Sequence, residues 1–158
     1  MDVQLPAGAT VLIDSSALVY LIEGEASSPR RRAMEAFLEE ARSKPLRLAA
    51  STLVWAELLE KPLSLGDQEL ASAYRRFLSD SSLIELRIVD VAIAERAAAL
   101  SASLLPAQRR RLSAADLVHM ATALTIAAAA VLGNDAAWRE VPACPPLILV
   151  DELVFDLD

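Results

Sequence analysis

The chain has 158 residues, of which 54% are hydrophobic and 23% are charged, and its formal net charge is −7. This composition excludes a disordered protein, because a chain of this length and hydrophobicity can bury a sizeable core. The negative charge argues against binding nucleic acid through a broadly basic surface, although acids gathered around a metal ion would add to the same total. We interpret residues 1–158 as a single domain with its core at about 10–150.

The sequence gives no indication of a membrane or secretory protein. Its N-terminus lacks the basic and apolar regions of a signal peptide, and its longest apolar stretch, MATALTIAAAAVLG, is too short to span a bilayer. The single cysteine, Cys144, excludes an intramolecular disulfide and suits a reducing compartment. We therefore expect a cytoplasmic protein that makes no membrane contact.

The first half of the chain alternates short apolar runs with amphipathic stretches. Its predicted elements are, in chain order, a strand at 10–13, a helix that ends at Gly24, a helix at 30–42, a strand at 46–52 and a helix that ends near Pro62. Ser15 or Ser16 is the expected N-cap of the first helix, because a hydroxyl there can accept from the first free backbone N–H groups.

The second half continues the alternation. Its predicted elements are a helix at 64–78, a strand at 83–89, a helix at 91–104 capped by Asp90, a helix at 112–127, a strand at 129–132, a helical turn at 135–140 and a strand at 147–150. Strands that alternate with helices indicate an α/β domain around a mostly parallel sheet. Ligands bind beyond the carboxyl ends of the strands in such sheets.

Four acidic residues fall at strand ends or just inside the helices that follow, namely Asp14, Glu57, Asp116 and Asp135. Carboxylates in apolar surroundings are costly unless they are hydrogen-bonded, paired or bound to a cation. If the four converge, they cannot all stay ionised without a cation. Oxygen ligands without cysteine or clustered histidine favour Mg²⁺ or Mn²⁺, and such an ion activates water for phosphodiester hydrolysis.

Each acid also has a purely structural interpretation. Asp14 and Asp135 can cap the segments they precede, and Asp116 completes a Ser113-x-x-Asp helix-start pattern. Glu57 can lie on the exposed face of its helix. His119 is interpreted as a partnered core histidine, with the alternative that it faces the site one helical turn after Asp116.

Four segments in order resemble the PIN domain, specifically the VapC-like toxin ribonucleases of toxin–antitoxin pairs. They are VLIDSSALVYLIEG, STLVWAELLEKP, LSAADLVHMATAL and VLGNDAAW. The resemblance implies a Rossmann-like, three-layer α/β/α sandwich with a mostly parallel central sheet. It also implies a hydrolase that cleaves single-stranded RNA with Mg²⁺ or Mn²⁺. The acids Asp14, Glu57, Asp116 and Asp135 match the catalytic metal site of the family, and Ser15 and Asn134 match small polar positions beside it.

The resemblance further implies a homodimer that a cognate antitoxin holds inactive. The chain departs from the family at Gly133, where Thr or Ser usually precedes the Asn-Asp pair, and we expect this glycine to allow a tight turn.

The expected phosphate contacts are arginines in two clusters, namely Arg30, Arg31, Arg109, Arg110 and Arg111. Trp138 is interpreted as a packing residue, with base stacking as the alternative. The alternative to a ribonuclease is a non-catalytic PIN-like module that holds a divalent cation and a protein partner.

Overall fold

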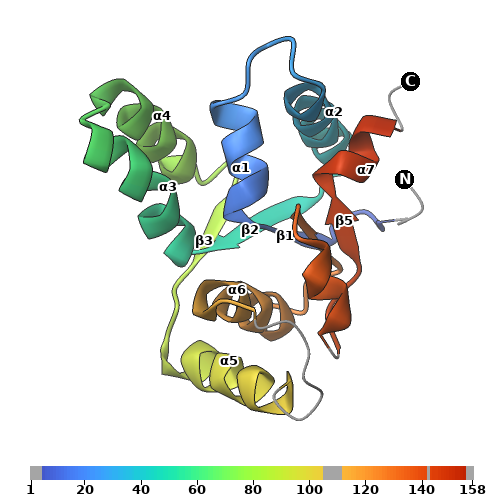
Figure 1. Ribbon diagram of the computed structural model, residues 1–158. Helices are drawn as coiled ribbons and strands as arrows, with labels where there is room; N and C mark the ends of the chain where they lie inside the picture. Colours follow the sequence, from blue (N-terminus) through green and yellow to red (C-terminus); the bar gives the residue numbers. More distant parts are fainter. Residues whose placement is uncertain (1–4, 105–111, 142, 156–158) are drawn as a thin grey trace.

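Five short strands form one sheet in the order β3–β2–β1–β4–β5, and every neighbouring pair is parallel (Figure 1). The computed structural model describes residues 5–104, 112–141 and 143–155. The strands are β1 (Thr10–Ile13), β2 (Arg47–Ser51), β3 (Glu85–Arg87), β4 (Ala130–Gly133) and β5 (Leu147–Leu149). An all-parallel sheet agrees with the α/β fold expected from the alternating pattern.

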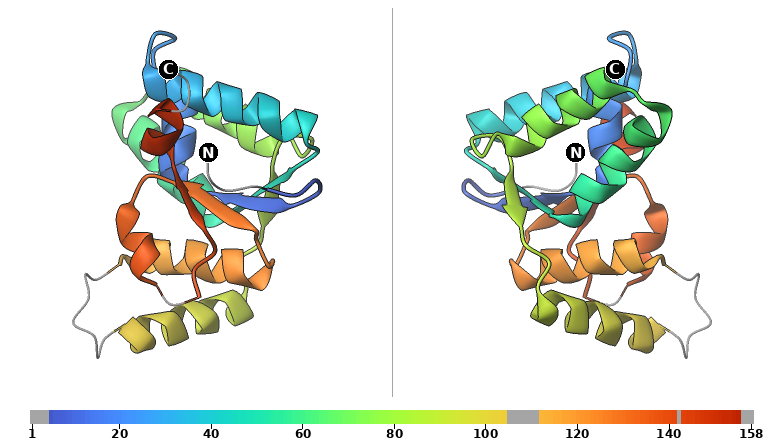
Figure 2. Two further views of the ribbon diagram at one scale, coloured as in Figure 1. Left: turned by 90° about the vertical axis from the view of Figure 1, so that its right-hand side faces the viewer. Right: turned by 90° about the vertical axis from the view of Figure 1, so that its left-hand side faces the viewer.

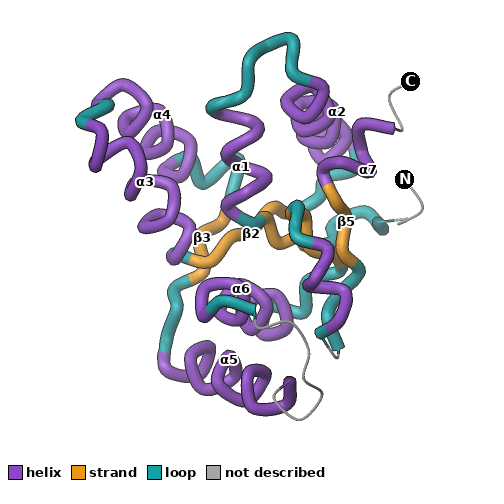
Figure 3. Tube along the Cα trace, viewed as in Figure 1, coloured by secondary structure: helices purple, strands orange, loops and turns teal. Residues whose placement is uncertain are grey.

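Helices make up most of the remaining described chain (Figure 3). They are α1 (Ser15–Ile22), α2 (Pro29–Ser43), α3 (Leu53–Leu65), α4 (Gln68–Ser79), α5 (Val91–Leu104), α6 (Ala114–Thr125), the 3₁₀ helix η2 (Ala136–Glu140) and α7 (Val150–Phe155). None of them, within the described ranges, has the length and apolar content needed to cross a membrane.

The helices lie on both sides of the sheet. Helices α1, α2, α3, α4 and α7 lie on one side, whereas α6 packs on the other with α5 beneath it (Figure 2). The predicted three-layer sandwich is therefore confirmed.

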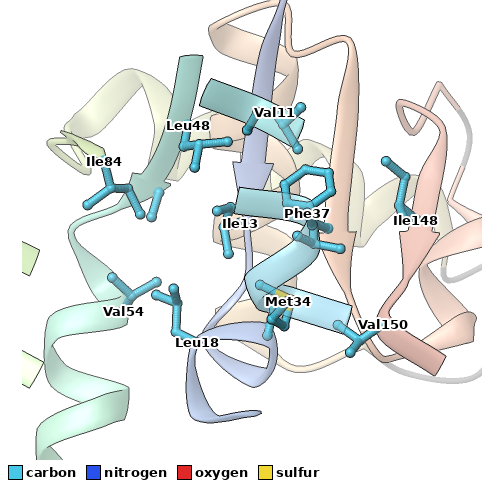
Figure 4. Packing of buried hydrophobic residues seen from close by; sticks show 14 of the residues in the cluster. Val11, Ile13, Leu18, Met34, Phe37, Leu48, Val54, Ile84, Ile148 and Val150 are labelled. Carbon is cyan, nitrogen blue, oxygen red and sulfur yellow. The ribbon is translucent and has the colours of Figure 1, made fainter. Parts of the chain in front are cut away.

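Alternation along β1 divides the core between the two sides of the sheet. Val11 and Ile13 pack with α1, α2 and α3, where Leu18, Met34 and Val54 meet them (Figure 4). Leu12, which points the other way, packs with residues of α6 and η2. Both faces of the strand are fully buried, which explains why its sequence is continuously apolar.

Several predicted boundaries are wrong. Helix α3 does not end near Pro62 but continues to Leu65, with Pro62 inside its last turn, and Gly66, with a φ of 70°, ends the helix in a left-handed conformation. The strand predicted at 83–89 covers only three residues, since Ile88 beyond it is 75% exposed. The last strand stops at Leu149, and the following residues form α7, a helix that the sequence interpretation missed.

Candidate functional site

The carboxyl ends of the central strands bring polar residues to one edge of the sheet. Ile13 of β1 lies opposite Leu132 of β4, and the backbone N–H of Asp14 donates to the Leu132 carbonyl at 2.8 Å. Asp14 therefore leaves β1 beside Gly133, the last residue of β4. On the other side of β1, β2 ends at Ser51. This edge is where open parallel sheets bind ligands.

Asp14 is the most deeply buried of the four acids, with 9% of its surface exposed. Its Oδ2 accepts hydrogen bonds from the Ser16 hydroxyl at 2.6 Å and the Ser16 backbone N–H at 3.2 Å, so that Asp14 is the N-cap of α1. The prediction that Ser15 or Ser16 caps this helix is wrong, whereas the capping interpretation of Asp14 is confirmed. Burial raises the pKa of Asp14, against the opposing effects of His119 and of the Ser16 hydrogen bonds.

His119 connects three elements at the edge. Its ring is 1% exposed, and its Nε2 lies 2.8 Å from Oε2 of Glu57 on α3 and 3.8 Å from Oδ1 of Asp14. Its Nδ1 lies 3.0 Å from the hydroxyl oxygen of Ser51. Both interpretations of this residue are confirmed together, because His119 is a buried, partnered histidine and it also faces the acids.

The surroundings of His119 have opposing effects on the pKa of its ring. Burial alone would lower the pKa of the imidazole. The hydrogen bond to Glu57 and the charges of Asp14, Glu57 and Asp116 outweigh that effect, so the pKa of His119 is raised. Three of the four predicted acids thus act on one ring.

Asp116 is fixed at the start of α6. Its Oδ2 accepts from the backbone N–H of Ser113 at 2.8 Å and from the Ser113 hydroxyl at 2.7 Å, and the same serine oxygen accepts from the Asp116 N–H. The predicted capping box is therefore confirmed. The Trp138 indole N–H donates to Oδ1 of Asp116 at 3.2 Å. Trp138 is 2% exposed, which confirms its interpretation as a packing residue.

Asp135 and Asn134 follow β4. Asp135 caps η2, where its Oδ1 accepts from the Ala137 backbone N–H at 2.9 Å. Asn134 donates from Nδ2 to the Tyr20 hydroxyl at 3.1 Å and to Oδ2 of Asp151 at 3.3 Å. Asp151, the second residue of α7, is therefore a carboxylate partner of Asn134 that the sequence interpretation did not name.

Gly133 lies against Asp14. A Cβ atom at this position would lie 3.2 Å from the Asp14 Cβ, closer than ordinary side-chain contacts. Gly133 belongs to β4, outside the positive-φ glycines, so its role is a close approach of two strands, not the tight turn that we expected.

The donor set suits a hard divalent cation in kind, because all four acids offer carboxylate oxygens. The buried Asp14 carboxylate, whose pKa burial raises, is a group that a nearby cation would stabilise in its ionised form. Among residues 5–104, 112–141 and 143–155, however, no three His, Cys, Asp or Glu side chains are gathered into a group able to hold a metal ion. Instead, Nε2 of His119 lies 2.8 Å from Oε2 of Glu57 and 3.8 Å from Oδ1 of Asp14.

The predicted phosphate-contacting arginines differ in their surroundings. Arg30 contacts Asp151 through Nε at 2.6 Å, and its guanidinium carbon lies 4.8 Å from the centroid of the Tyr20 ring. Arg31 donates to Glu35 and to the Gly24 carbonyl, both at 2.8 Å. The cluster at 109–111 lies outside the described residues.

Two contacts of the site, one to an acid and one to the histidine beside the acids, were missed. Ser16 donates to Asp14, although the family resemblance pointed to Ser15, and Ser51 contacts His119. The signal for Ser51 was its position as a hydroxyl at the end of an apolar strand, but a strand-end serine is common and does not by itself identify a partner.

Comparison with known protein families gives one match. Residues 11–143 match the model of the PIN domain. Comparison with the curated proteins gives no match.

Solved structures with this fold include several toxin complexes. The VapBC2 complex of Rickettsia felis, bound to a promoter DNA fragment, has a TM-score of 0.73 and 18% identity, covering 89% of this chain and 98% of that chain. The DNA-bound VapBC complex of Salmonella typhimurium has a TM-score of 0.72 and 14% identity, covering 90% and 98%. VapC20 of Mycobacterium tuberculosis, a sarcin-ricin loop cleaving toxin, has a TM-score of 0.61 and 20% identity, covering 80% and 90%. At these identities the similarity shows the fold alone.

Proposed function

The chain belongs to the PIN-domain family, and from that premise we propose that it is a metal-dependent endoribonuclease that hydrolyses phosphodiester bonds of single-stranded RNA, acting as the toxin of a toxin–antitoxin pair. The observation that carries the proposal is that Nε2 of His119 lies 2.8 Å from Glu57 and 3.8 Å from Asp14 at the carboxyl edge of the sheet, where the charge of Asp116 acts on the same ring. Asp135 follows β4 at the same edge, two residues after the glycine that lies against Asp14.

Asp14, Glu57, Asp116 and Asp135 would hold Mg²⁺ or Mn²⁺ in this proposal. When bound, the ion supplies a water of lowered pKa and neutralises charge on the phosphate. Hydrolysis would form a bond from the water oxygen to phosphorus and break the bond to the 3′ oxygen, which would take up a proton. The products are a 5′-phosphate and a 3′-hydroxyl.

The protein itself would contribute to this chemistry by holding the acids in fixed orientations. Ser16 donates to Asp14, His119 contacts Glu57, and Ser113 with Trp138 holds both oxygens of Asp116. Carboxylates held in one orientation before the substrate arrives need no reorganisation during the reaction.

We call the part of the sheet edge that holds Asp14, Glu57, Asp116 and Asp135 the acidic edge. Arginines outside it would contact the RNA backbone. Arg30 and Arg31 begin α2, and Arg109, Arg110 and Arg111 belong to the same proposal by charge alone. A guanidinium matches phosphate in shape and charge, which supports this role. To bind RNA, Arg30 would have to give up its contact with the half-exposed carboxylate of Asp151 and contact a phosphate instead.

The partners follow from the same premise. We propose a homodimer in the cytoplasm that a cognate antitoxin inhibits. The antitoxin is supported by solved structures of similar fold that contain toxin–antitoxin complexes, one of them from Klebsiella pneumoniae at a TM-score of 0.62.

Cleavage of a mixed RNA pool in Mg²⁺, in Mn²⁺ and in EDTA tests the proposal, with protein freed of any co-purified antitoxin. The variant Asp14→Asn removes one charge but keeps a side chain that caps helices well. The matched control is Asp67→Asn, since Asp67 also caps a helix, accepting from the Leu70 N–H at 2.9 Å, and takes no part in the acidic edge.

We expect cleavage that requires the metal, disappears in Asp14→Asn and persists in Asp67→Asn. Equal cleavage by all three proteins would assign the activity to a contaminant and contradict the proposed site. Folded protein that binds Mn²⁺ and cuts nothing in a broad pool would favour the alternative, a non-catalytic module that holds a cation and a protein partner.

A further inference from the structure

A hydrogen-bonded chain runs from the start of α3 through the interior to Glu57. The Leu53 backbone N–H donates to the Ser51 hydroxyl oxygen at 3.2 Å, and that oxygen lies 3.0 Å from Nδ1 of His119. The opposite ring nitrogen, Nε2, lies 2.8 Å from Oε2 of Glu57. Ser51 and His119 are 0% and 1% exposed, so water does not compete for these contacts.

The direction of these hydrogen bonds, from donor to acceptor, follows from which atoms have a proton to donate. The Ser51 oxygen already accepts from Leu53, so its own proton is free to go to Nδ1 of His119. The neutral ring then carries its proton on Nε2 and donates it to Glu57. A doubly protonated ring also donates from Nε2, so the contact with Glu57 does not depend on the charge state of the histidine.

The ring that makes this contact is held from the side as well. Its centroid lies 6.3 Å from that of Trp138, with 23° between the two planes. Trp138 in turn donates to Asp116. Two neighbouring buried rings therefore each present an N–H to one of the acids.

Glu57 needs a hydrogen-bond partner such as His119 to keep its carboxylate beside the other acids. Its side chain is 28% exposed, so solvent is available as the alternative surrounding for a flexible carboxylate. The same Nε2 lies 3.8 Å from Oδ1 of Asp14, so the N–H draws the two carboxylates toward one point.

We propose that His119 is a positioning residue that holds the Glu57 carboxylate turned toward Asp14, and thereby sets the affinity of the acidic edge for a divalent cation. This inference rests on the proposed function, because it assigns Glu57 to the metal.

Two amide variants of His119 separate this role from simple packing. A glutamine places its amide nitrogen near the position of Nε2 and keeps a donor toward Glu57, whereas an asparagine places its amide oxygen near the position of Nδ1, accepts from the Ser51 hydroxyl and leaves Glu57 without a donor. The dissociation constant of Mn²⁺ is measured by calorimetry on metal-stripped protein, and kcat and KM for RNA cleavage are measured separately. Circular dichroism and thermal melting establish that each variant is folded.

We expect His119→Asn to weaken Mn²⁺ binding by about tenfold or more, as loss of a partner that orients a metal ligand commonly does. His119→Gln should stay within about threefold of the wild-type dissociation constant, and the loss of cleavage in His119→Asn should fall on kcat with little change in KM. Equal Mn²⁺ affinities in all three proteins, or equal losses in both variants, would overturn the inference.

Ser51→Ala serves if His119→Asn does not fold. It removes one anchor of the ring and leaves the bond to Glu57, so Mn²⁺ binding should weaken measurably but by less than about tenfold, and an unchanged affinity would contradict the proposed chain. Wild-type protein that binds no Mn²⁺ would overturn both the proposed function and this inference. Wild-type binding with no dependence on residue 119 would overturn the inference alone.

Discussion

Two hydrogen-bond networks lie at the carboxyl edge of the sheet, and they differ mainly in burial. The inner network consists of Ser51, Glu57 and His119, of which the serine and the histidine are almost completely buried. The outer network consists of Tyr20, Arg30, Asn134 and Asp151. Its ion pair, Arg30 with Asp151, is 45% and 47% exposed.

The difference teaches that hydrogen-bond geometry alone does not set the energy of a network. A buried donor or acceptor that loses its partner keeps the full cost of desolvation, whereas an exposed one takes a water molecule instead. The outer contact between Arg30 and Asp151 is shorter than the inner contact between His119 and Glu57, at 2.6 Å against 2.8 Å. We nevertheless expect the inner network to contribute more to the free energy of unfolding.

The largest effect is expected for His119→Leu, which keeps the volume of the ring approximately but removes both nitrogens. Ser51 loses its buried acceptor and Glu57 loses its donor, so the free energy of unfolding should fall by about 2–3 kcal/mol. Urea denaturation in EDTA measures this. A loss below about 0.5 kcal/mol would mean that water replaces the ring nitrogens, and the comparison between the two networks would fail.

Ser51→Ala should have the next largest effect, because it leaves the Leu53 N–H and the His119 ring without a buried partner. We expect a loss of about 1–2 kcal/mol in the same urea experiment. The matched control is Ser103→Ala, which removes a hydroxyl that donates to the Leu100 carbonyl in an exposed position. Equal losses in the two variants would show that burial does not distinguish these serines.

The fold, and the positions of Asp14 and Asp135 at the ends of strands, could be predicted from the sequence because both depend on local signals. Continuously apolar runs indicated buried parallel strands, and amphipathic periods indicated the helices between them. Asp14 and Asp135 were located by their position immediately after such runs. Parallel strands bring their carboxyl ends to one edge, so chain order alone implied that these residues share it.

The contacts of the inner network could not be predicted, because they join residues far apart in the chain. His119 and Glu57 are separated by 62 positions and His119 and Ser51 by 68. Only the packing of α6 across the sheet decides that this histidine faces the acids. Helix α7 was missed for a different reason, since its first residue, Val150, continues the apolar run of β5 and hides the point where the helix begins.

A smaller effect is expected in the outer network. A double-mutant cycle with Arg30→Ala and Asp151→Asn should give a coupling below about 1 kcal/mol, because the pair is half-exposed and solvent screens it. Adding about 1 M NaCl should reduce this coupling further. A coupling free energy as large as the loss of unfolding free energy in His119→Leu, and unchanged by salt, would show that the two networks contribute equally to stability.

The smallest effect is the pH dependence of the outer network, and its sign follows from Asp151. The hydrogen bond from the Arg30 guanidinium, assisted by Asn134, holds the pKa of Asp151 below its ordinary value of 3.8. The stabilisation by ionised Asp151 is therefore fully present above this ordinary value, and it is lost as the pH falls through the lowered pKa of the folded protein. The difference in unfolding free energy between wild type and Asp151→Asn should be constant between about pH 7 and pH 5, and it should shrink toward pH 3.

His119, with its raised pKa, predicts the opposite sign for the inner network, namely stabilisation that is present below its ordinary pKa of 6.5 and decreases as the pH rises. Urea titrations of Asp151→Asn between about pH 7 and pH 3, and of His119→Leu from about pH 6 up to about pH 9, separate the two networks by the direction of their pH dependence. A common direction would show that the two networks titrate as one electrostatic unit.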